Sequence, residues 1–295
     1  MDLQLDQLRA LDAAVAEGTF EAAARRLRVT PSAISQRIKA LEAAVGRILL
    51  QRTKPVRPTD SGLAVLRLAR QIELLTGDTA RELGSAAMES DDRVRIPLAV
   101  NADSLETWVL PALAAAPAGV YFEIHREDEE HTVGLLRDGT VMAAITAAAQ
   151  PVQGCTARRL GAMRYRPVAT PEFVRTWFAE GATARAFDTA PVVIFDRKDD
   201  LQDRLMRRRA RRPLDPPRHY IPSSSGYAEA VRHGLGWGML PDQQGSADLA
   251  SGRLVVLDPR LHIDVPLYWQ QWRLDSPALG AVAATIAAEA ARALG

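Results

Sequence analysis

The chain has 295 residues, of which 47% are hydrophobic and 25% charged, and its formal net charge is +1. This length predicts two domains with packed cores. The near-neutral charge argues against a protein that coats DNA without specificity.

The single cysteine, Cys155, excludes an internal disulfide and fits a reducing compartment. We expect it in a loop beside Gly154, where it has no partner, so a redox-sensing role is disfavoured. No apolar run approaches membrane-spanning length, and the N-terminus lacks a secretion signal. These features predict a cytoplasmic protein with no membrane partner.

The first predicted elements are two short helices joined by a tight turn, within Phe20 to Lys39. Thr30 is a candidate N-cap for the second helix, and Pro31 stands at the first helical position, where its missing N–H costs nothing. Apolar residues recur at helical intervals along both helices, and we expect them to share one small core: Ala23, Leu27, Ile34, Ile38 and Leu41.

The outer face of the second helix carries hydroxyl, amide and cationic side chains, which are the groups that read base edges and phosphates. Residues 1–59 carry 10 Lys/Arg against 6 Asp/Glu, whereas the rest of the chain carries 27 against 30. The basic excess thus lies on this module, as contact with phosphates requires. The spacing alone would also fit a generic amphipathic helical hairpin. We predict contacts to double-stranded DNA from Thr30, Pro31, Ser32, Ser35, Gln36, Arg37 and Lys39.

Two short strands around a turn, a wing, are expected next, over Ile48 to Leu50 and Thr53 to Pro58. Arg52 and Lys54, with Arg57 nearby, can reach the DNA backbone or the minor groove. The alternative is a solvated hairpin that touches nothing.

A long helix should follow the wing, capped by Thr59, Asp60 or Ser61 and running to about Ala87, because this stretch is nearly free of helix breakers. Apolar residues alternate by three and four along it, which is typical of a two-stranded coiled coil and therefore predicts a homodimer, with a homotetramer as the alternative. A single helix packed on its own domain would show a similar stripe. The predicted seam is Val65, Leu68, Ile72, Leu75 and Thr79, and residues 84–93 are expected to form a hinge.

From about residue 93 onward the pattern changes to strands alternating with helices, which is typical of an α/β domain with mostly parallel sheets. Helices are expected over Ser104 to Ala115 and His131 to Arg137. The predicted strands are Arg95 to Val100, Val120 to His125, Val141 to Thr146, Arg166 to Ala169, Val192 to Phe195, Gly236 to Leu240 and Leu254 to Leu257.

The stretch from about Leu3 to Thr59 resembles the winged helix-turn-helix of the LysR-type transcriptional regulators. The segment S-A-I-S-Q-R-I-K-A-L-E, which begins at Ser32, and R-P-T-D-S-G, from Arg57 to Gly62, carry this resemblance. Four later segments are similar to the arginine- and lysine-responsive, ArgP/LysG-type branch of that family: Val100 to Trp108, Glu127 to His131, Leu235 to Pro241 and Pro266 to Gln270.

The resemblance implies a winged helix-turn-helix (1–59), a linker and dimerisation helix with a hinge (60–92), and a periplasmic-binding-protein-like effector domain (93–295). The effector domain would have two lobes, lobe I at about 93–160 and 267–295 and lobe II at about 161–266. The implied function is a regulator that senses lysine or arginine and controls an amino-acid export gene. RNA polymerase is a possible further partner.

Ligands of such domains bind at the carboxyl ends of strands and the N-termini of helices. Backbone N–H groups there can hold a carboxylate, and nearby acids can hold an amino group and a cationic side chain. Each acid could instead be a solvated loop residue or a helix cap. The predicted effector site is Asn101, Asp103, Ser104, Glu127, Asp128, Thr146, Asp196 and Ser224.

Other classes of function stay open at this point. A regulator of the same family could sense a different small molecule, and an architectural protein could bind DNA without any ligand. An enzyme is disfavoured because neither a nucleophile paired with a base nor a metal-ligand cluster is visible, and we expect no cofactor or metal. The basic run Arg207 to Arg212 could be a second nucleic-acid patch, but a solvated surface segment is the preferred interpretation.

Overall fold

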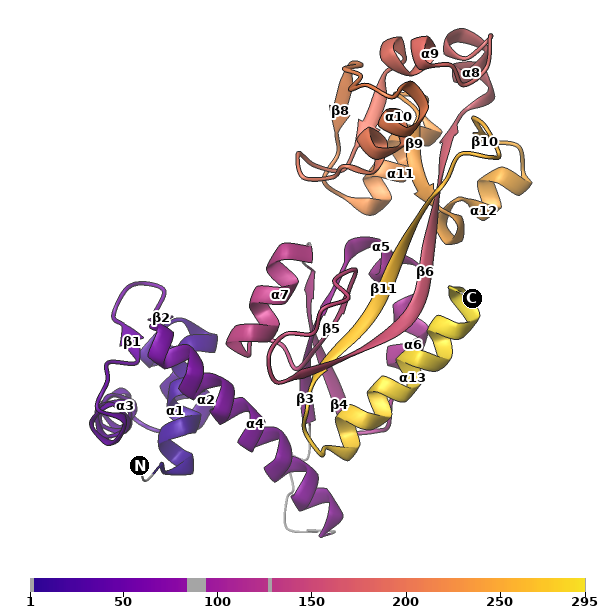
Figure 1. Cartoon of the computed structure of the whole chain (residues 1–295). Helices are drawn as coiled ribbons and strands as arrows, with labels where there is room; N and C mark the ends of the chain where they lie inside the picture. The colour runs from indigo at the N-terminus through magenta and orange to yellow at the C-terminus, as the bar shows by residue number, and fades with distance from the viewer. Residues whose placement is uncertain (1–2, 84–93, 127–128, 295) are drawn as a thin grey trace.

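The computed structural model describes residues 3–83, 94–126 and 129–294. The predicted hinge at 84–93 and the predicted effector residues Glu127 and Asp128 lie outside the described residues. Figure 1 shows the N-terminal module on one side, the linker helix leading away from it, and a two-lobed domain beyond.

The N-terminal module consists of three helices and a wing: α1 (Leu5–Glu17), α2 (Phe20–Leu27), α3 (Pro31–Val45), β1 (Leu50–Gln51) and β2 (Arg57–Pro58). As predicted, Thr30 caps α3, since its hydroxyl accepts a hydrogen bond from the Ala33 N–H at 3.2 Å. Four of the five predicted core residues are buried, and Leu27 packs partly buried against them. The wing strands β1 and β2 pair antiparallel and are shorter than predicted.

The linker helix α4 (Asp60–Glu82) begins at its cap Thr59, whose hydroxyl accepts a hydrogen bond from the Gly62 N–H at 3.0 Å. Leu66 and Ala69 are buried in the core of the N-terminal module, whereas Leu74 is buried in the core of the effector domain. One helix therefore belongs to two hydrophobic cores.

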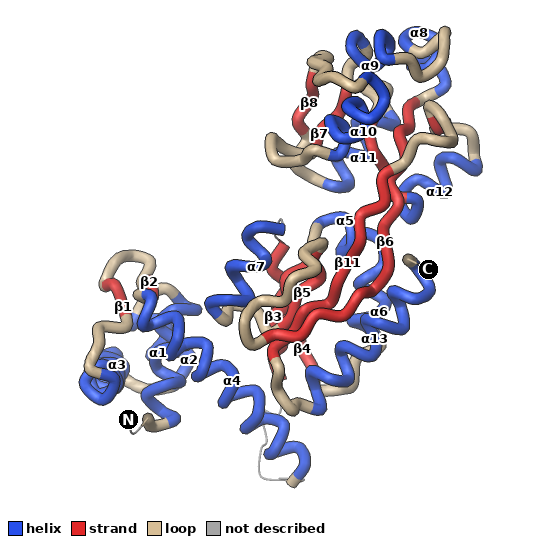
Figure 2. Tube along the Cα trace, in the orientation of Figure 1, coloured by secondary structure: helices blue, strands red, loops and turns tan. Residues whose placement is uncertain are grey.

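The effector domain alternates helices with strands (Figure 2). Its helices are α5 (Ala102–Ser104), the π-helical turn η1 (Leu105–Val109), α6 (Leu110–Ala114), α7 (Glu129–Asp138), α8 (Pro171–Trp177), α9 (Ala184–Thr189), α10 (Leu201–Ala210), α11 (Ser224–Arg232), α12 (Asp242–Ala250) and α13 (Pro277–Ala293). Its strands are β3 (Val94–Val100), β4 (Val120–Arg126), β5 (Ala143–Thr146), β6 (Cys155–Ala169), β7 (Val192–Ile194), β8 (Arg218–Tyr220), β9 (Gly238–Pro241), β10 (Val255–Val256) and β11 (Ile263–Trp272).

The main sheet has seven strands in the order β10-β6-β11-β5-β3-β4, with β9 paired to β6 outside this path. β4 and β5 run parallel to β3, but β11 is antiparallel to β5 and β6, and β6 is antiparallel to β9 and β10. The prediction of mostly parallel sheets is therefore wrong. β6 carries the chain from lobe I to lobe II and β11 carries it back, so these two long strands run in opposite directions (Figure 1).

The predicted strands differ most from the structure at the two crossover strands, and β8 of the separate sheet β7-β8 was also missed. β11 and β8 were not predicted, and β6 begins eleven residues before the predicted Arg166. Cys155 is the first residue of β6 and is buried, so its predicted place in a loop is wrong. Burial raises the pKa of its thiol to about 11, which leaves it protonated and unreactive at neutral pH.

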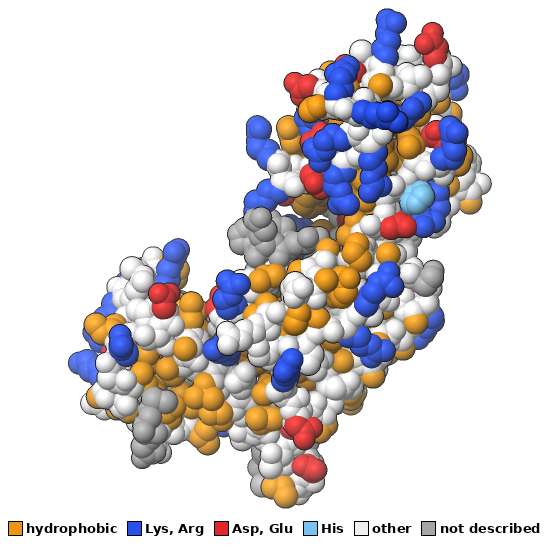
Figure 3. Space-filling view, viewed as in Figure 1, with side chains coloured by type: hydrophobic (Ala, Val, Ile, Leu, Met, Phe, Trp, Pro, Cys, Tyr) orange, Lys and Arg blue, Asp and Glu red, His pale blue; other side chains and the backbone are white. Residues whose placement is uncertain are grey.

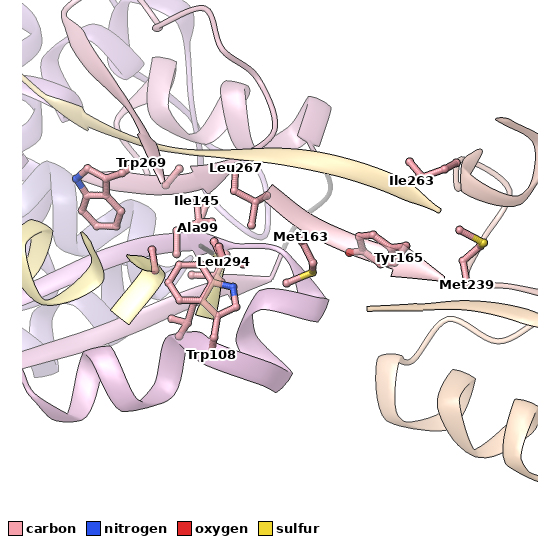
Figure 4. Packing of buried hydrophobic residues seen from close by; sticks show 14 of the residues in the cluster. Ala99, Trp108, Ile145, Met163, Tyr165, Met239, Ile263, Leu267, Trp269 and Leu294 are labelled. Carbon is pink, nitrogen blue, oxygen red and sulfur yellow. The ribbon is translucent and has the colours of Figure 1, made fainter. Parts of the chain in front are cut away.

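The crossover has an irregular register between Leu267 and Tyr268 of β11, opposite Gly161 of β6. A Cβ at Gly161 would lie 2.7 Å from the Cβ of Leu294, so only glycine lets the end of α13 pack there. Figure 4 shows buried side chains along this path, from Trp108 and Ile145 in lobe I past Tyr165 to Met239 in lobe II. The division into lobes at about residues 160 and 267 stays a prediction that this irregularity supports.

Candidate DNA-binding face and effector site

The outer face of α3 carries the predicted base-reading residues. Ser32, Gln36 and Lys39 are exposed, and Ser35 is half-buried, while Ile34 and Ile38 point into the core. The Ser32 hydroxyl lies 3.0 Å from that of Thr30, at the start of the helix. The helix thus presents polar groups to solvent over its first three turns, with its apolar side fixed against α1 and α2.

Arg37 differs from its predicted neighbours. Its Nε lies 3.1 Å from the Asp6 carboxylate of α1, with the two side chains 31% and 54% exposed. The pair connects α3 to α1 from a partly exposed position. The Arg37 guanidinium therefore already has a partner within the protein. Its predicted DNA contact stays a prediction.

The wing is held by Glu42, which sequence reasoning did not single out. Its Oε1 accepts hydrogen bonds from the backbone N–H groups of Leu49 and Leu50, at 2.9 and 3.4 Å. The three wing cations Arg52, Lys54 and Arg57 are exposed, and within the described residues they make no hydrogen bond or ion pair. Their charges face solvent, as a role in phosphate contact requires.

The predicted effector residues begin at one edge of the main sheet. Because β3 and β5 are parallel, with Val100 opposite Ile145, Asn101 just after β3 and Thr146 at the end of β5 lie side by side. The Asn101 Oδ1 accepts a hydrogen bond from the Ser104 N–H at 2.8 Å, which starts α5. Thr146 is buried, and its hydroxyl accepts from the Ala148 N–H at 3.2 Å.

Asp103 joins this edge to lobe II. Its Oδ2 accepts a hydrogen bond from the Tyr165 hydroxyl of β6, and its Oδ1 accepts one from the Ser224 hydroxyl at the start of α11, both at 2.7 Å. Asp103, Tyr165 and Ser224 are distant in sequence, and the fold brings them together. Two of the predicted residues, Asp103 and Ser224, are therefore direct neighbours.

The charge of Asp103 affects two buried neighbours at this junction. Burial, together with the Asp103 carboxylate, raises the pKa of Tyr165 well above its usual value, so the phenol stays protonated and donates its hydrogen bond. Burial also raises the pKa of Asp199, to which the charge of Asp103 adds. Asp199 was missed by sequence reasoning, which selected Asp196 instead.

Asp196 is engaged locally. Its Oδ1 accepts hydrogen bonds from the backbone N–H groups of Lys198 and Asp199, at 2.7 and 3.1 Å. This is an Asp-stabilised turn of the kind that acids in loops commonly form. Its predicted contact to an effector stays a prediction.

Two buried polar groups at α5 and η1 have no hydrogen-bond partner in the described part of the chain. The Ser104 hydroxyl and the Trp108 indole N–H are 0% and 2% exposed as residues, and neither has a hydrogen-bond partner among the described residues. Buried groups of this kind normally have a partner, so they stand ready to bind one.

The segment Leu235 to Pro241 has a structural role at the site. The Tyr227 hydroxyl accepts hydrogen bonds from the Met239 N–H at 2.7 Å and the Gln202 amide at 2.9 Å. A Cβ on Gly238 would lie 2.7 Å from that hydroxyl oxygen, so glycine is required there. This buried network fixes α11, and with it Ser224, against β9.

The basic run Arg207 to Arg212 lies at the end of α10. Arg212 lies 2.9 Å from the Asp188 carboxylate, and the Arg209 Nε donates to the Ala182 carbonyl at 2.7 Å. Figure 3 shows Lys and Arg side chains gathered on lobe II, far from the N-terminal module. These contacts within lobe II favour the solvated surface over a second nucleic-acid patch.

Metal ligation and membrane insertion find no support in the described part of the chain. Over residues 3–83, 94–126 and 129–294 there is no cluster of three or more His, Cys, Asp or Glu side chains that could hold a metal ion. Within the same residues, no helix combines the length and apolarity that crossing a membrane needs.

Comparison with known proteins agrees with this architecture. Residues 5–63 match the family of bacterial regulatory helix-turn-helix proteins of the lysR type, and residues 91–291 match the LysR substrate binding domain. The chain is 46% identical to the transcriptional regulator LysG of Mycobacterium tuberculosis over 293 residues, which covers 98% of this chain and 95% of that one.

Two further likenesses come from Corynebacterium glutamicum. The lysine export transcriptional regulatory protein LysG is 41% identical, over 94% of this chain and 93% of that one. The structure of full-length LysG with bound effector Arg has a TM-score of 0.78 and 37% identity, covering 99% of both chains. The fold class and the predicted branch are thereby confirmed: this chain belongs to the LysR family of bacterial regulatory helix-turn-helix proteins, among its LysG and ArgP members.

Proposed function

We propose that this protein is a cytoplasmic, homo-oligomeric transcription factor, without enzymatic activity, that binds promoter DNA and senses lysine or arginine. Its target is a gene for amino-acid export. The observation that carries the proposal is the acidic junction at Asp103, where side chains of both lobes meet. Relatives that regulate lysine export or bind arginine add support.

The effector half of the proposal rests on charge and on unpartnered donors. A cationic side chain at this junction would offset the negative charge of the two acids, because burial raises the pKa of Asp199 and the charge of Asp103 raises it further. The ligand carboxylate would accept from the buried Ser104 hydroxyl, which has no partner among the described residues. Glu127 and Asp128 stay in the proposed site as sequence predictions.

Binding at such a junction would change how the lobes are held together. Asp103 accepts one hydrogen bond from Ser224 of lobe II and one from Tyr165 of the crossover. A carboxylate has about four acceptor sites, so a ligand ammonium group can add to these bonds or replace one of them. Either event favours one arrangement of the lobes and shifts the regulator between states.

The DNA half rests on the exposed polar face of α3 and the free wing cations. We assign base readout to Ser32 and Gln36, and positioning on phosphates to Thr30, Ser35, Lys39, Arg52 and Lys54. Pro31 and Arg37 belong to the same face. A pair of modules gains specificity by reading two half-sites, which is why an oligomer is part of the proposal.

The linker helix offers the surface for that oligomer. Val65 and Ile72 pack on the core of the N-terminal module, but Leu68 belongs to neither core and Leu75 is 37% exposed. Leu68 is half-buried and Leu75 exposed, and apolar side chains seven residues apart on one helix face are typical of a coiled-coil contact. We therefore assign Leu68 and Leu75 to the interface between subunits.

The test is a titration of the purified full-length protein with lysine and arginine, with norleucine and citrulline as neutral isosteres. We expect the cationic amino acids to raise the melting temperature and to bind much more tightly than the isosteres, because an isostere leaves a desolvated carboxylate without a partner. Equal binding of lysine and norleucine would contradict a basic effector. No shift with any amino acid, together with equal affinity for all DNA sequences, would favour the architectural alternative.

A further inference from the structure

We propose that Arg70 of the linker helix couples the effector domain to the helix-turn-helix. The inference rests on the proposed function, since it concerns how a bound amino acid alters DNA binding. The Arg70 Nε donates to the Asp12 Oδ1 of α1 at 2.8 Å, and its NH1 donates to the Gly139 carbonyl, just after α7, at 2.6 Å. One side chain thus touches the DNA-binding module and the effector domain at once.

The contact to the DNA-binding module is protected from water. Asp12 is 8% exposed, and the Arg70 side chain is 14% exposed. The Asp12 Oδ2 also lies 3.6 Å from Arg26 of α2. Asp12 therefore links Arg70 to both α1 and α2, the helices on which the recognition helix α3 packs. A charge-assisted hydrogen bond at such low exposure is stronger than a surface ion pair.

The contact to the effector domain uses backbone carbonyls at the end of α7 and just after it. The last carbonyls of a helix lack partners within the helix and carry its negative dipole end. Arg67 donates to the Arg137 carbonyl at 3.0 Å, one turn along α4 from Arg70. The Trp272 indole donates to the Leu136 carbonyl at 3.2 Å, which ties the same end to the crossover strand β11.

Gly139 permits this approach. Its φ is +78°, and a Cβ there would lie 2.8 Å from the Cβ of Arg67 and 2.9 Å from its Cα. Any other residue would push α7 away from α4, and its backbone would be strained as well. The sequence at this point is therefore suited to holding the two helices in contact.

The other end of α7 lies at the effector site. β3 and β4 are parallel, with Val100 opposite Arg126, so α7 starts at the same sheet edge as Asn101 and Asp103. A helix of 10 residues spans roughly 15 Å and moves as a rigid rod. A displacement at the site is thereby carried to the carbonyls that Arg70 and Arg67 bind.

The two arginines differ in a way that makes the proposal testable. Arg70 uses two separate N–H groups of one planar guanidinium to reach two partners, whereas Arg67, among the described residues, donates only to the end of α7. A lysine ammonium on a single flexible stem does not reproduce the two-ended geometry. Arg70→Lys should therefore break the connection while keeping the charge, and Arg67→Lys should retain most of its single contact.

The experiment measures the affinity of full-length protein for its operator DNA with and without saturating lysine. For allosteric proteins this ratio is typically about 5–150. We expect Arg70→Lys to bring the ratio close to one while leaving lysine affinity unchanged, and Arg67→Lys to keep it near that of the wild type. Asp12→Ala, which removes the acceptor of the same contact from the other side, should behave like Arg70→Lys.

A second measurement needs no ligand. Amide hydrogen exchange of the same variants should show faster exchange both in α1 and at the end of α7 for Arg70→Lys, but only at the end of α7 for Arg67→Lys. If Arg70→Lys leaves α1 exchange and the affinity ratio unchanged, the proposal is overturned. If wild-type protein binds neither lysine nor arginine, the proposed function fails, and the exchange pattern still decides whether Arg70 couples the two domains.

Discussion

The DNA-binding face and the effector junction are built in opposite ways. The polar face of α3 comes from one continuous stretch, Thr30 to Lys39, and each side chain is placed by the helix alone. The effector junction joins Asp103, Tyr165 and Ser224, which the Asp103 hydrogen bonds span over 62 and 121 positions of sequence. A contiguous site is specified by local periodicity, whereas an assembled site depends on the whole sheet topology.

The linker helix should show the largest effect, because both sites depend on the oligomer that it is proposed to form. Leu68→Asp together with Leu75→Asp would place charges in an apolar interface, at a cost of several kcal/mol. Sedimentation should show monomers, and operator binding should fall steeply. Leu235→Asp, at an exposed leucine of lobe II, serves as the control for adding an acid. A double variant that remains a folded dimer would move the interface elsewhere.

The effector junction is tested by comparing the lysine affinity of variants at two of its predicted acids. Asp103→Asn removes a charge at the lobe junction, and a charged hydrogen bond contributes roughly 1.5–3 kcal/mol, so lysine affinity should fall by about 10- to 150-fold. Asp196→Asn should have little effect, since an amide oxygen still accepts the two backbone N–H groups of its turn. Calorimetric titration of both variants decides between them. If only Asp196→Asn lowers lysine affinity, the effector contact lies at Asp196, as its position in the sequence predicted, and not at Asp103.

The DNA-binding face of α3 is likewise tested by comparing two substitutions. Gln36→Ala should cost roughly 1–3 kcal/mol on the specific operator and little on random DNA. Arg37→Ala is the neighbouring comparison, because Arg37 already pairs with Asp6. We expect it to lower thermal stability more than it lowers specificity. Equal losses on operator and random DNA would show that Gln36 positions the backbone and does not read bases.

The wing should contribute a smaller and non-specific part. Arg52→Ala and Lys54→Ala should each weaken binding to all sequences and reduce the slope of log affinity against log salt by about one. Fluorescence anisotropy over a salt series measures this slope. An unchanged slope in both variants would remove these two cations from the DNA contacts.

The smallest expected effect lies at the crossover, in the pair Arg164–Asp264, with side chains 44% and 39% exposed. The hydrogen bond from Arg164 holds the pKa of Asp264 below its usual value. The pair therefore stabilises the folded state above the unfolded pKa of about 3.9, and this is lost as pH falls through the lower folded pKa. Asp264→Asn should lower Tm by no more than a few degrees at neutral pH. The difference should vanish in acid and shrink in high salt.

The sequence predicted the elements whose signals are local. The Thr30 cap, the burial of Ile34 and Ile38, and the start of α4 at Thr59 all follow from short-range rules. β11 escaped prediction because Pro266 stands inside it, and proline within a run of residues argues against a strand. The early part of β6 escaped because Arg158 and Arg159 precede a glycine, a pattern that reads as a loop.

Within the effector site, position in the chain predicted Asp103 but not its partners. Nothing near Tyr165 in the sequence indicates that it donates to an acid 62 residues away. Asp196 and Asp199 occupy the same loop, and both accept hydrogen bonds from its backbone N–H groups. Only the fold decides that the charge of Asp103 acts on Asp199. The same holds for Arg70 and Asp12, which meet because α4 returns across α1.

Because α4 contributes side chains to two hydrophobic cores, it constrains the engineering of chimeric sensors. A cut before Asp60 would leave the winged module without Leu66 and Ala69, and a cut after Leu83 would take Leu74 and Asp78 away from the ligand-sensing half. Each cut removes part of a hydrophobic core from one of the two halves. The helix α4 is therefore a poor place to join halves of different regulators. A hybrid regulator that responds to a new metabolite should transplant the helix faces together with the partners they cover.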